Sequence, residues 1–256
     1  MKKTIFLLYG IIAYVVFLAT FTYAVGFVST ILVPKHIDST PRSSLGYAFM
    51  INAALLTLFA VQHSVMARPA FKRWWTKIIP EPIERSTYVL LASACLLLMF
   101  QYWEPMGGVV WEVESASLQV VLKGLCLFGF FIVLISTFLI NHFDLFGLRQ
   151  VWFYFTGKKY EHLPFRTPFF YQYVRHPLYL GFMIAFWATP TMTFAHLFFA
   201  IMTTAYMVTA IQFEENDLVH TFGSKYQEYK KSAPMLIPFM KIKKRKGISS
   251  SSSTAN

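Results

Sequence analysis

The sequence predicts an all-α fold, namely a polytopic membrane helix bundle with four spans and a C-terminal helical hairpin. Of its 256 residues 56% are hydrophobic and only 14% are charged, whereas soluble domains are usually about one quarter charged. The mean hydropathy is +0.49. The 27 Phe, 14 Tyr and 6 Trp are too many to be hidden inside a soluble body of this size. These observations exclude a disordered chain, a collagen, a disulfide scaffold and an ordinary cytosolic enzyme.

Four apolar runs and one longer block predict the individual elements. A membrane-spanning helix needs roughly 20 apolar residues, and about 17 still suffice. The four predicted spans, of which the third is short, are residues 4–28, 45–67, 87–103 and 120–140. The block 178–213 is too long for one span and is interrupted by Pro190. Because proline breaks a helix, we expect a hairpin of residues 177–189 and 194–213.

The distribution of charge predicts the orientation. The formal net charge is +11. With the N-terminus in the cytoplasm, 20 of the 23 basic residues fall on the cytoplasmic side, and only Lys35, Arg42 and Lys123 do not. Such a bias sets topology and favours contact with lipid over nucleic acid. We therefore expect a multi-pass protein of a bacterial inner membrane, with both termini cytoplasmic and no obligatory protein partner.

The domain organisation is predicted to be simple. Residues 1–240 form a single integral membrane domain. Residues 241–256 are basic and then serine-rich, a composition typical of a disordered tail.

Polar residues gather at one face of the predicted bundle. Ionisable groups at membrane depth are costly, so they are candidate functional residues. Five expected helix ends bring them to the cytoplasmic face: Gln62-His63-Ser64, Arg85 with Tyr88, Asn141-His142-Phe143-Asp144, Arg175-His176 and Glu214-Glu215-Asn216-Asp217. The opposite face has only two histidines, His36 and His196. This asymmetry predicts a site that opens to the cytoplasm.

Each of these residues also has a structural interpretation. His63 could be an interhelical hydrogen-bonding residue, and His142 and Asp144 could cap helix ends. Three histidines could converge on a metal, but the sequence has no HxxxH or HxxEH pair and no cysteine near these ends. We therefore expect no metal site. No Walker or Rossmann glycine pattern stands in the required context.

Two C-terminal motifs resemble the isoprenylcysteine carboxyl methyltransferase superfamily. The first is Arg175-His176-Pro177-Leu178-Tyr179-Leu180-Gly181, which matches RHPxYxG. The second begins at Glu214-Glu215 and matches EExxLxxxFGxxYxxYxxxxP. The resemblance implies an S-adenosylmethionine pocket, mainly within residues 171–238, that is formed by Arg175, His176, Tyr179, Leu180, Gly181, Glu214 and Glu215.

The chemistry of these residues suits that cofactor. Pro177 can begin a helix without losing a hydrogen bond. His176 then lies beside free helix-start amides, where a carboxylate binds readily. Glu214 or Glu215 can hold an ammonium group or ribose hydroxyls.

Three further segments resemble the bacterial methanethiol S-methyltransferases and the wider nurim-like group. They are residues 59–72, 83–90 and 136–150. The resemblance implies that methanethiol and S-adenosylmethionine react to give dimethyl sulfide and S-adenosylhomocysteine. We expect His63, or His142 held by Asp144, to take the thiol proton or to stabilise the thiolate, with Tyr88 in the same site. Arg149 is expected to stabilise the anion or to orient Asp144.

Other functions stay open at this level. The same cofactor pocket could serve carboxyl methylation of prenylated cysteine. A reductase that uses NADPH, as sterol reductases do, is disfavoured because the sequence has no clear site for the 2′-phosphate. A nurim-like structural membrane protein would bind no cofactor, and the charged cluster at one face argues against it.

Overall fold

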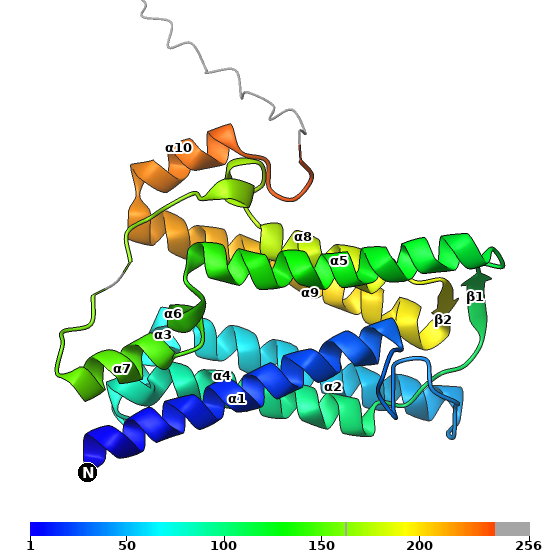
Figure 1. Ribbon diagram of the computed structural model, residues 1–256, viewed down its shortest axis with the longest axis horizontal. Coiled ribbons are helices and arrows are strands. Elements are labelled where there is room, and N and C mark those ends of the chain that lie inside the picture. The colour runs from blue at the N-terminus through cyan, green and yellow to red at the C-terminus, as the bar shows by residue number, and fades with distance from the viewer. Residues whose placement is uncertain (162, 239–256) are drawn as a thin grey trace, which may run out of the picture.

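The computed structural model describes residues 1–161 and 163–238 as a bundle of helices that run along one common direction (Figure 1). Within these residues, five helices are long and apolar enough to cross a membrane: α1 (Lys2–Ser29), α2 (Leu45–Ala67), α4 (Glu81–Tyr102), α5 (Ala116–Ile140) and α9 (Phe194–Phe222). A shorter apolar helix, α8 (Pro177–Trp187), packs against α5 and α9. The predicted helical membrane bundle is thereby confirmed.

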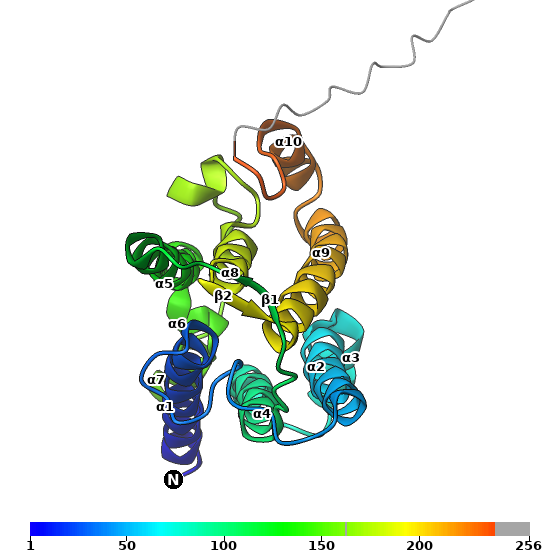
Figure 2. The same ribbon diagram turned by 90° about the vertical axis from the view of Figure 1, so that its right-hand side faces the viewer.

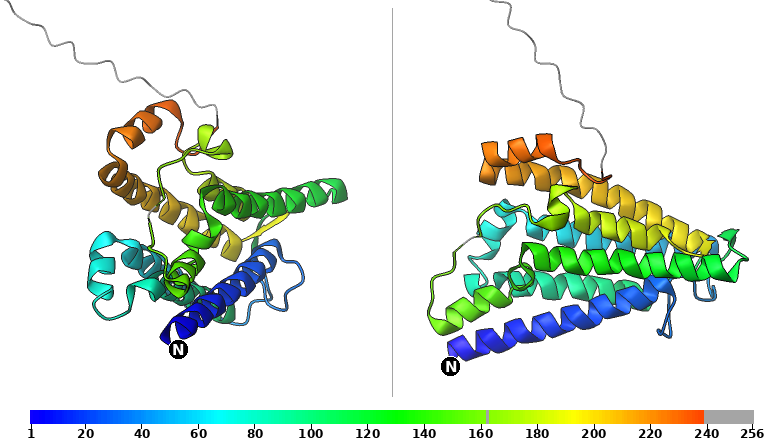
Figure 3. Two further views of the ribbon diagram at one scale, coloured as in Figure 1. Left: turned by 60° about the vertical axis from the view of Figure 1, so that its left-hand side comes forward. Right: turned by 45° about the horizontal axis from the view of Figure 1, so that its top comes forward.

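The two ends of the bundle differ. One end holds the N-terminus and the short helices α3 (Pro69–Trp75), α6 (His142–Leu145), α7 (Leu148–Thr156), η1 (Phe169–Gln172) and α10 (Ser224–Ser232) (Figures 1 and 3). We call it the polar end. The other, the strand end, holds β1 (Val109–Glu112) and β2 (Thr191–Thr193). These strands pair antiparallel, with Val109 opposite Thr193.

Two element boundaries differ most from the prediction. Helix α4 begins at Glu81 and not at Thr87, because Pro82 occupies its first turn, where proline is well tolerated. Helix α9 continues to Phe222, nine residues beyond the predicted end at Phe213. The apolar run ends at Phe213, but the helical hydrogen bonds continue to Phe222. Glu214 and Glu215 therefore lie inside α9. The division into one domain and a tail stays a prediction, and residues 241–256 lie outside the described residues.

The break between α8 and α9 lies where Pro190 predicts it. Thr193 begins α9 as its N-cap, and its side chain accepts a hydrogen bond from the His196 backbone N–H at 3.1 Å. The His196 side chain is fully buried. Its ring nitrogens lie 3.0 Å from the Asp38 carboxylate and 3.0 Å from the Phe186 carbonyl oxygen. His196 thus joins the hairpin to the loop after α1 and belongs to the fold.

Glycines allow α5 and α8 to approach closely. A Cβ atom on Gly129 would lie 2.6 Å from the carbonyl oxygen of Gly181. A Cβ atom on Gly181 would lie 2.7 Å from the carbonyl oxygen of Gly129. Small residues at such crossings are typical of membrane helices, where close packing replaces the hydrophobic driving force. This contact positions α8, which begins at Pro177, the last residue of the RHP motif.

The largest buried cluster joins the two layers of the bundle. Viewed from the strand end, α1, α4 and α2 form one row, and α5, α8 and α9 form another (Figure 2). Phe27, Phe100 and Trp103 from the first row pack with Phe130 and Phe199 from the second. The indole of Trp103 donates a hydrogen bond to the Ile37 carbonyl oxygen at 3.2 Å. This core therefore holds the two rows of helices together, and the candidate site lies at the polar end.

Candidate active site

Glu215 is the buried centre of an ionic cluster at the polar end. Its Oε1 accepts a hydrogen bond from Nε of Arg175 at 2.7 Å and lies 3.1 Å from Nε2 of His176. Its Oε2 lies 2.7 Å from Nζ of Lys230. The residue is only 3% exposed. Because both carboxylate oxygens are engaged, Glu215 joins α8, α9 and α10 and is poorly placed to bind a ligand directly.

Arg175 also holds α10 against the start of α8. Its Nη1 donates hydrogen bonds to the carbonyl oxygens of Lys230 at 3.2 Å and Ala233 at 2.6 Å. These carbonyls end α10 and have no partner within that helix. The backbone N–H of Arg175 donates to the Pro234 carbonyl oxygen at 2.9 Å. Arg175 therefore positions the site.

Glu214 has a different environment from its neighbour. One of its oxygens, Oε2, accepts a hydrogen bond from the Tyr179 hydroxyl at 3.0 Å, and Nδ1 of His176 lies 3.9 Å from that same oxygen. The Glu214 side chain is 43% exposed. Glu214 and Tyr179 thus present a carboxylate that a ligand can reach, beside a buried imidazole.

Leu180 and Gly181, adjacent in α8, contact different parts of the structure. The backbone N–H of Leu180 bonds to the His176 carbonyl oxygen within α8, and its side chain is partly buried. Gly181 faces α5, in contact with Gly129. The lack of a side chain at Gly181 therefore allows α8 to approach α5 closely.

His63 and Tyr88 meet between α2 and α4. The Tyr88 hydroxyl lies 3.0 Å from the ring nitrogens of His63. Phe59, one turn earlier in α2, stacks on the imidazole with ring centroids 5.1 Å apart and an interplanar angle of 24°. The guanidinium of Arg85 lies 5.0 Å from the Tyr88 ring centroid. His63 thus lies in an aromatic setting beside a hydroxyl and a cation.

His142 occupies a separate cluster, where both its ring nitrogens have partners. Nε2 lies 2.7 Å from the Tyr14 hydroxyl, and Nδ1 lies 2.8 Å from Oγ1 of Thr137. Phe138 stacks on the ring at 4.1 Å. Burial lowers the pKa of His142, so the neutral imidazole is favoured. The predicted pairing of His142 with Asp144 is wrong, because Tyr14 and Thr137 take both nitrogens.

Asp144 instead organises the turn between α6 and α7. Its Oδ1 accepts hydrogen bonds from Nη1 of Arg149 at 3.1 Å and from the Tyr160 hydroxyl at 2.9 Å. Asn141 caps α6 by accepting a hydrogen bond from the Asp144 backbone N–H. Burial and the nearby Asp144 carboxylate raise the pKa of Tyr160 to about 12. The predicted contact of Arg149 with Asp144 is present.

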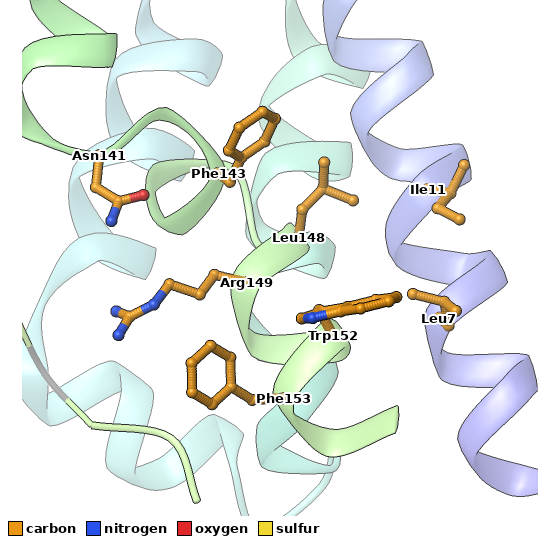
Figure 4. A pocket seen from close by; sticks show the side chains of 8 residues that line it. All are labelled: Leu7, Ile11, Asn141, Phe143, Leu148, Arg149, Trp152 and Phe153. Atoms are coloured by element: carbon orange, nitrogen blue, oxygen red, sulfur yellow. The ribbon is translucent and has the colours of Figure 1, made fainter. Parts of the chain in front are cut away.

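An apolar groove of about 530 Å³ opens beside this cluster. Figure 4 shows Leu7 and Ile11 of α1 across from Trp152 of α7, with Arg149 pointing away from them. The other lining residues are Asn141, Phe143, Leu148 and Phe153. The groove therefore borders Arg149 and neither Glu214 nor His63.

Within the described residues, polar contacts from α2, the helix of His63, and from Arg68 directly after it reach α9, the helix of Glu214. Oγ of Ser64 lies 3.1 Å from the Tyr206 hydroxyl. Nη1 of Arg68 lies 2.9 Å from Oδ2 of Asp217. These contacts therefore connect the cluster around His63 to the cluster around Glu214 through α9. His142, Asp144 and Arg149 belong to the α1, α6 and α7 side.

Sequence reasoning missed several residues of these clusters. Lys230 and Tyr160 lie in segments outside the expected helix ends, and only the tertiary contacts reveal them. Tyr206 is a polar aromatic residue within an apolar run, a weak signal that could have marked it. No group of three or more His, Cys, Asp or Glu in the described part of the chain could hold a metal ion.

The fold and the clusters define a multi-pass membrane protein with a buried ionic site at one end of the bundle. A family model described as "NnrU protein" matches residues 51–226. The chain is 54% identical over 240 residues to a methanethiol S-methyltransferase of Crocosphaera subtropica, covering 94% of each chain. It is 49% identical over 239 residues to that of Mycobacterium tuberculosis, covering 93% of this chain and 98% of the relative.

The chain therefore belongs to the NnrU protein family, together with the methanethiol S-methyltransferases, and is a methyltransferase enzyme. A more distant similarity extends to Nurim of Rattus norvegicus, 31% identical over 176 residues, with 64% of this chain and 65% of that protein covered. No solved structure matches the chain.

Proposed function

We propose that this protein methylates methanethiol with S-adenosylmethionine as donor and releases dimethyl sulfide. The identity of 54% over 94% of a methanethiol S-methyltransferase carries the proposal. The pair of Glu214 and Tyr179 beside His176 supports it, because it supplies an accessible carboxylate of the kind that the donor requires.

The residues fit an S-adenosylmethionine site in a specific way. Bound S-adenosylmethionine supplies a methyl group on a sulfonium sulfur, which a thiolate can take by in-line displacement. Glu214, half exposed and steadied by Tyr179, is suited to hold the ammonium group or the ribose hydroxyls. Arg175, His176 and Glu215 form the buried frame beneath it. Leu180 and Gly181 hold the first turns of α8 in place.

We assign proton removal from the thiol to His63. A ring nitrogen of His63 takes the proton, and the Tyr88 hydroxyl, 3.0 Å away, orients the ring. Such a site contributes mainly by positioning the reactants and excluding water. His142 is the weaker candidate, since Tyr14 and Thr137 already bond to both its nitrogens. Asp144 and Arg149 order the α6–α7 turn.

The proposed location is a bacterial inner membrane, with the site facing the cytoplasm. The polar end holds the basic residues of α3, among them Lys72 and Arg73, and the end of α10 with Lys230 and Lys231. Positively charged ends of membrane proteins face the cytoplasm. Methanethiol is small and apolar enough to arrive through the lipid. We propose no obligatory protein partner.

Calorimetric titration of S-adenosylmethionine into the detergent-purified full chain tests this function. We expect binding to the wild type and at least tenfold weaker binding to Glu214→Gln and His176→Ala. Headspace detection of dimethyl sulfide after addition of methanethiol tests the acceptor, with farnesylated cysteine as the competing substrate. A folded wild type that binds no S-adenosylmethionine would reject the proposal and favour a nurim-like structural protein.

A further inference from the structure

We propose that Tyr206 of α9 is a positioning residue that holds His63 at a set place relative to Glu214. The inference rests on the proposed function, in which His63 serves the acceptor and Glu214 serves the donor. It gives a role to a tyrosine that neither sequence motif contains.

Tyr206 contacts the neighbours of His63 on two sides. Its hydroxyl lies 3.1 Å from Oγ of Ser64, the residue that follows His63 in α2. Its ring meets Phe59 edge to face, with centroids 6.3 Å apart and an interplanar angle of 70°. Phe59 in turn stacks on the His63 imidazole. Tyr206 therefore restrains both the backbone turn and the ring that set the position of His63.

The same helix carries the donor residue. Glu214 follows Tyr206 by eight residues in α9, which is about 12 Å along the helix axis at 1.5 Å per residue. Because α9 is continuous from Tyr206 to Glu214, the contact of Tyr206 with α2 fixes the distance between His63 and Glu214.

The polar contact of Arg68, directly after α2, with Asp217 of α9 is less able to set this distance. The side chains of Arg68 and Asp217 are 33% and 39% exposed, and exposed ion pairs contribute little because water and salt screen them. The contact of Ser64 with Tyr206 adjoins His63 in the chain. Methyl transfer requires closely aligned reacting atoms, and a misplacement of about 1 Å can cost about a hundredfold in rate.

The test compares Tyr206→Phe with the wild-type full chain in detergent. The variant keeps the ring and loses only the hydroxyl. We expect kcat for dimethyl sulfide formation to fall at least tenfold. The dissociation constant for S-adenosylmethionine should stay within twofold, because Glu214 and Tyr179 are untouched. Ser64→Ala should lower kcat similarly, and the double variant should be no worse than either single one.

Tyr47→Phe is the matched control, because Tyr47 is an exposed tyrosine of α2 near the strand end. It should retain wild-type kcat. Wild-type kcat in Tyr206→Phe would reject the role of Tyr206 while leaving the proposed function intact. Equal loss of S-adenosylmethionine binding, thermal stability and kcat would reject it too, since that pattern marks a structural residue. A wild type that forms no dimethyl sulfide would reject the proposed function and this inference with it.

Discussion

The carboxylate of Glu215 lies 2.7 Å from Nε of Arg175, and this buried pair joins α9 to the residues that begin α8. Their side chains are 5% and 10% exposed. Glu214 precedes Glu215 in the chain but leaves 43% of its side chain exposed. Successive helical residues point about 100° apart, so two adjacent glutamates serve two roles. Glu215 belongs to the buried ionic cluster, and Glu214 is available to a ligand.

Replacing Glu215 with Ala should destabilise the protein strongly. It would leave Arg175 and Lys230 without their carboxylate, and breaking a buried ion pair from one side costs about 3–5 kcal/mol. Thermal unfolding in detergent, followed by circular dichroism, should show a large fall in Tm. Glu214→Ala is the matched control and should change Tm little. Equal Tm values for the two variants would contradict the division of roles.

Substitution of His63 should lower turnover, whereas substitution of His142 should mainly lower stability. We expect His63→Gln to lower kcat by about a hundredfold, within the 10²–10⁴ range of general base catalysis, with S-adenosylmethionine binding preserved. His142→Gln should act mainly on stability, because its ring bonds to Tyr14 and Thr137. Steady-state dimethyl sulfide formation and calorimetry measure both effects. Near-normal turnover in His63→Gln would show that the base lies elsewhere.

Gly129 should not tolerate even one extra methyl group. In Gly129→Ala the new Cβ would lie 2.6 Å from backbone atoms of α8, and overpacking of this kind costs about 1–3 kcal/mol. Gly124→Ala, on the same helix, places its Cβ in open space and gains helix propensity. Thermal unfolding should therefore give a lower Tm for the first variant and an unchanged or higher Tm for the second. The reverse order would contradict the α5–α8 contact.

Stability should decrease in mild acid, in part through His142. Burial lowers its pKa below the usual value of about 6.5, so the unfolded chain binds the proton more tightly than the folded one. The contribution of neutral His142 to the free energy of unfolding is complete above about pH 6.5. It is lost as the pH falls from there toward the pKa of the folded state. The fall in Tm between pH 7.5 and 5.5 should be smaller in His142→Gln. An identical fall in both proteins would contradict this.

The sequence predicted which residues gather at the polar end but only part of how they pair. Hydropathy and charge bias act through the membrane environment and are visible in any window of residues. Whether Asp144 meets His142 or Arg149 depends on the geometry of the α6 turn, which no spacing reveals. The Lys230 contact with Glu215 depends on how α10 folds back, so it too was not predicted.

The sequence by itself determined the membrane class, the spans and the break at Pro190, because these follow from apolar length and local backbone chemistry. The motifs at Arg175 and Glu214 marked the region of the candidate site. Only the tertiary structure decided that Glu215 is enclosed by cations, that Gly181 serves helix packing, and that Tyr206 joins α2 to α9. Each of these depends on which faces of distant helices meet, and that is settled by packing among all of them at once.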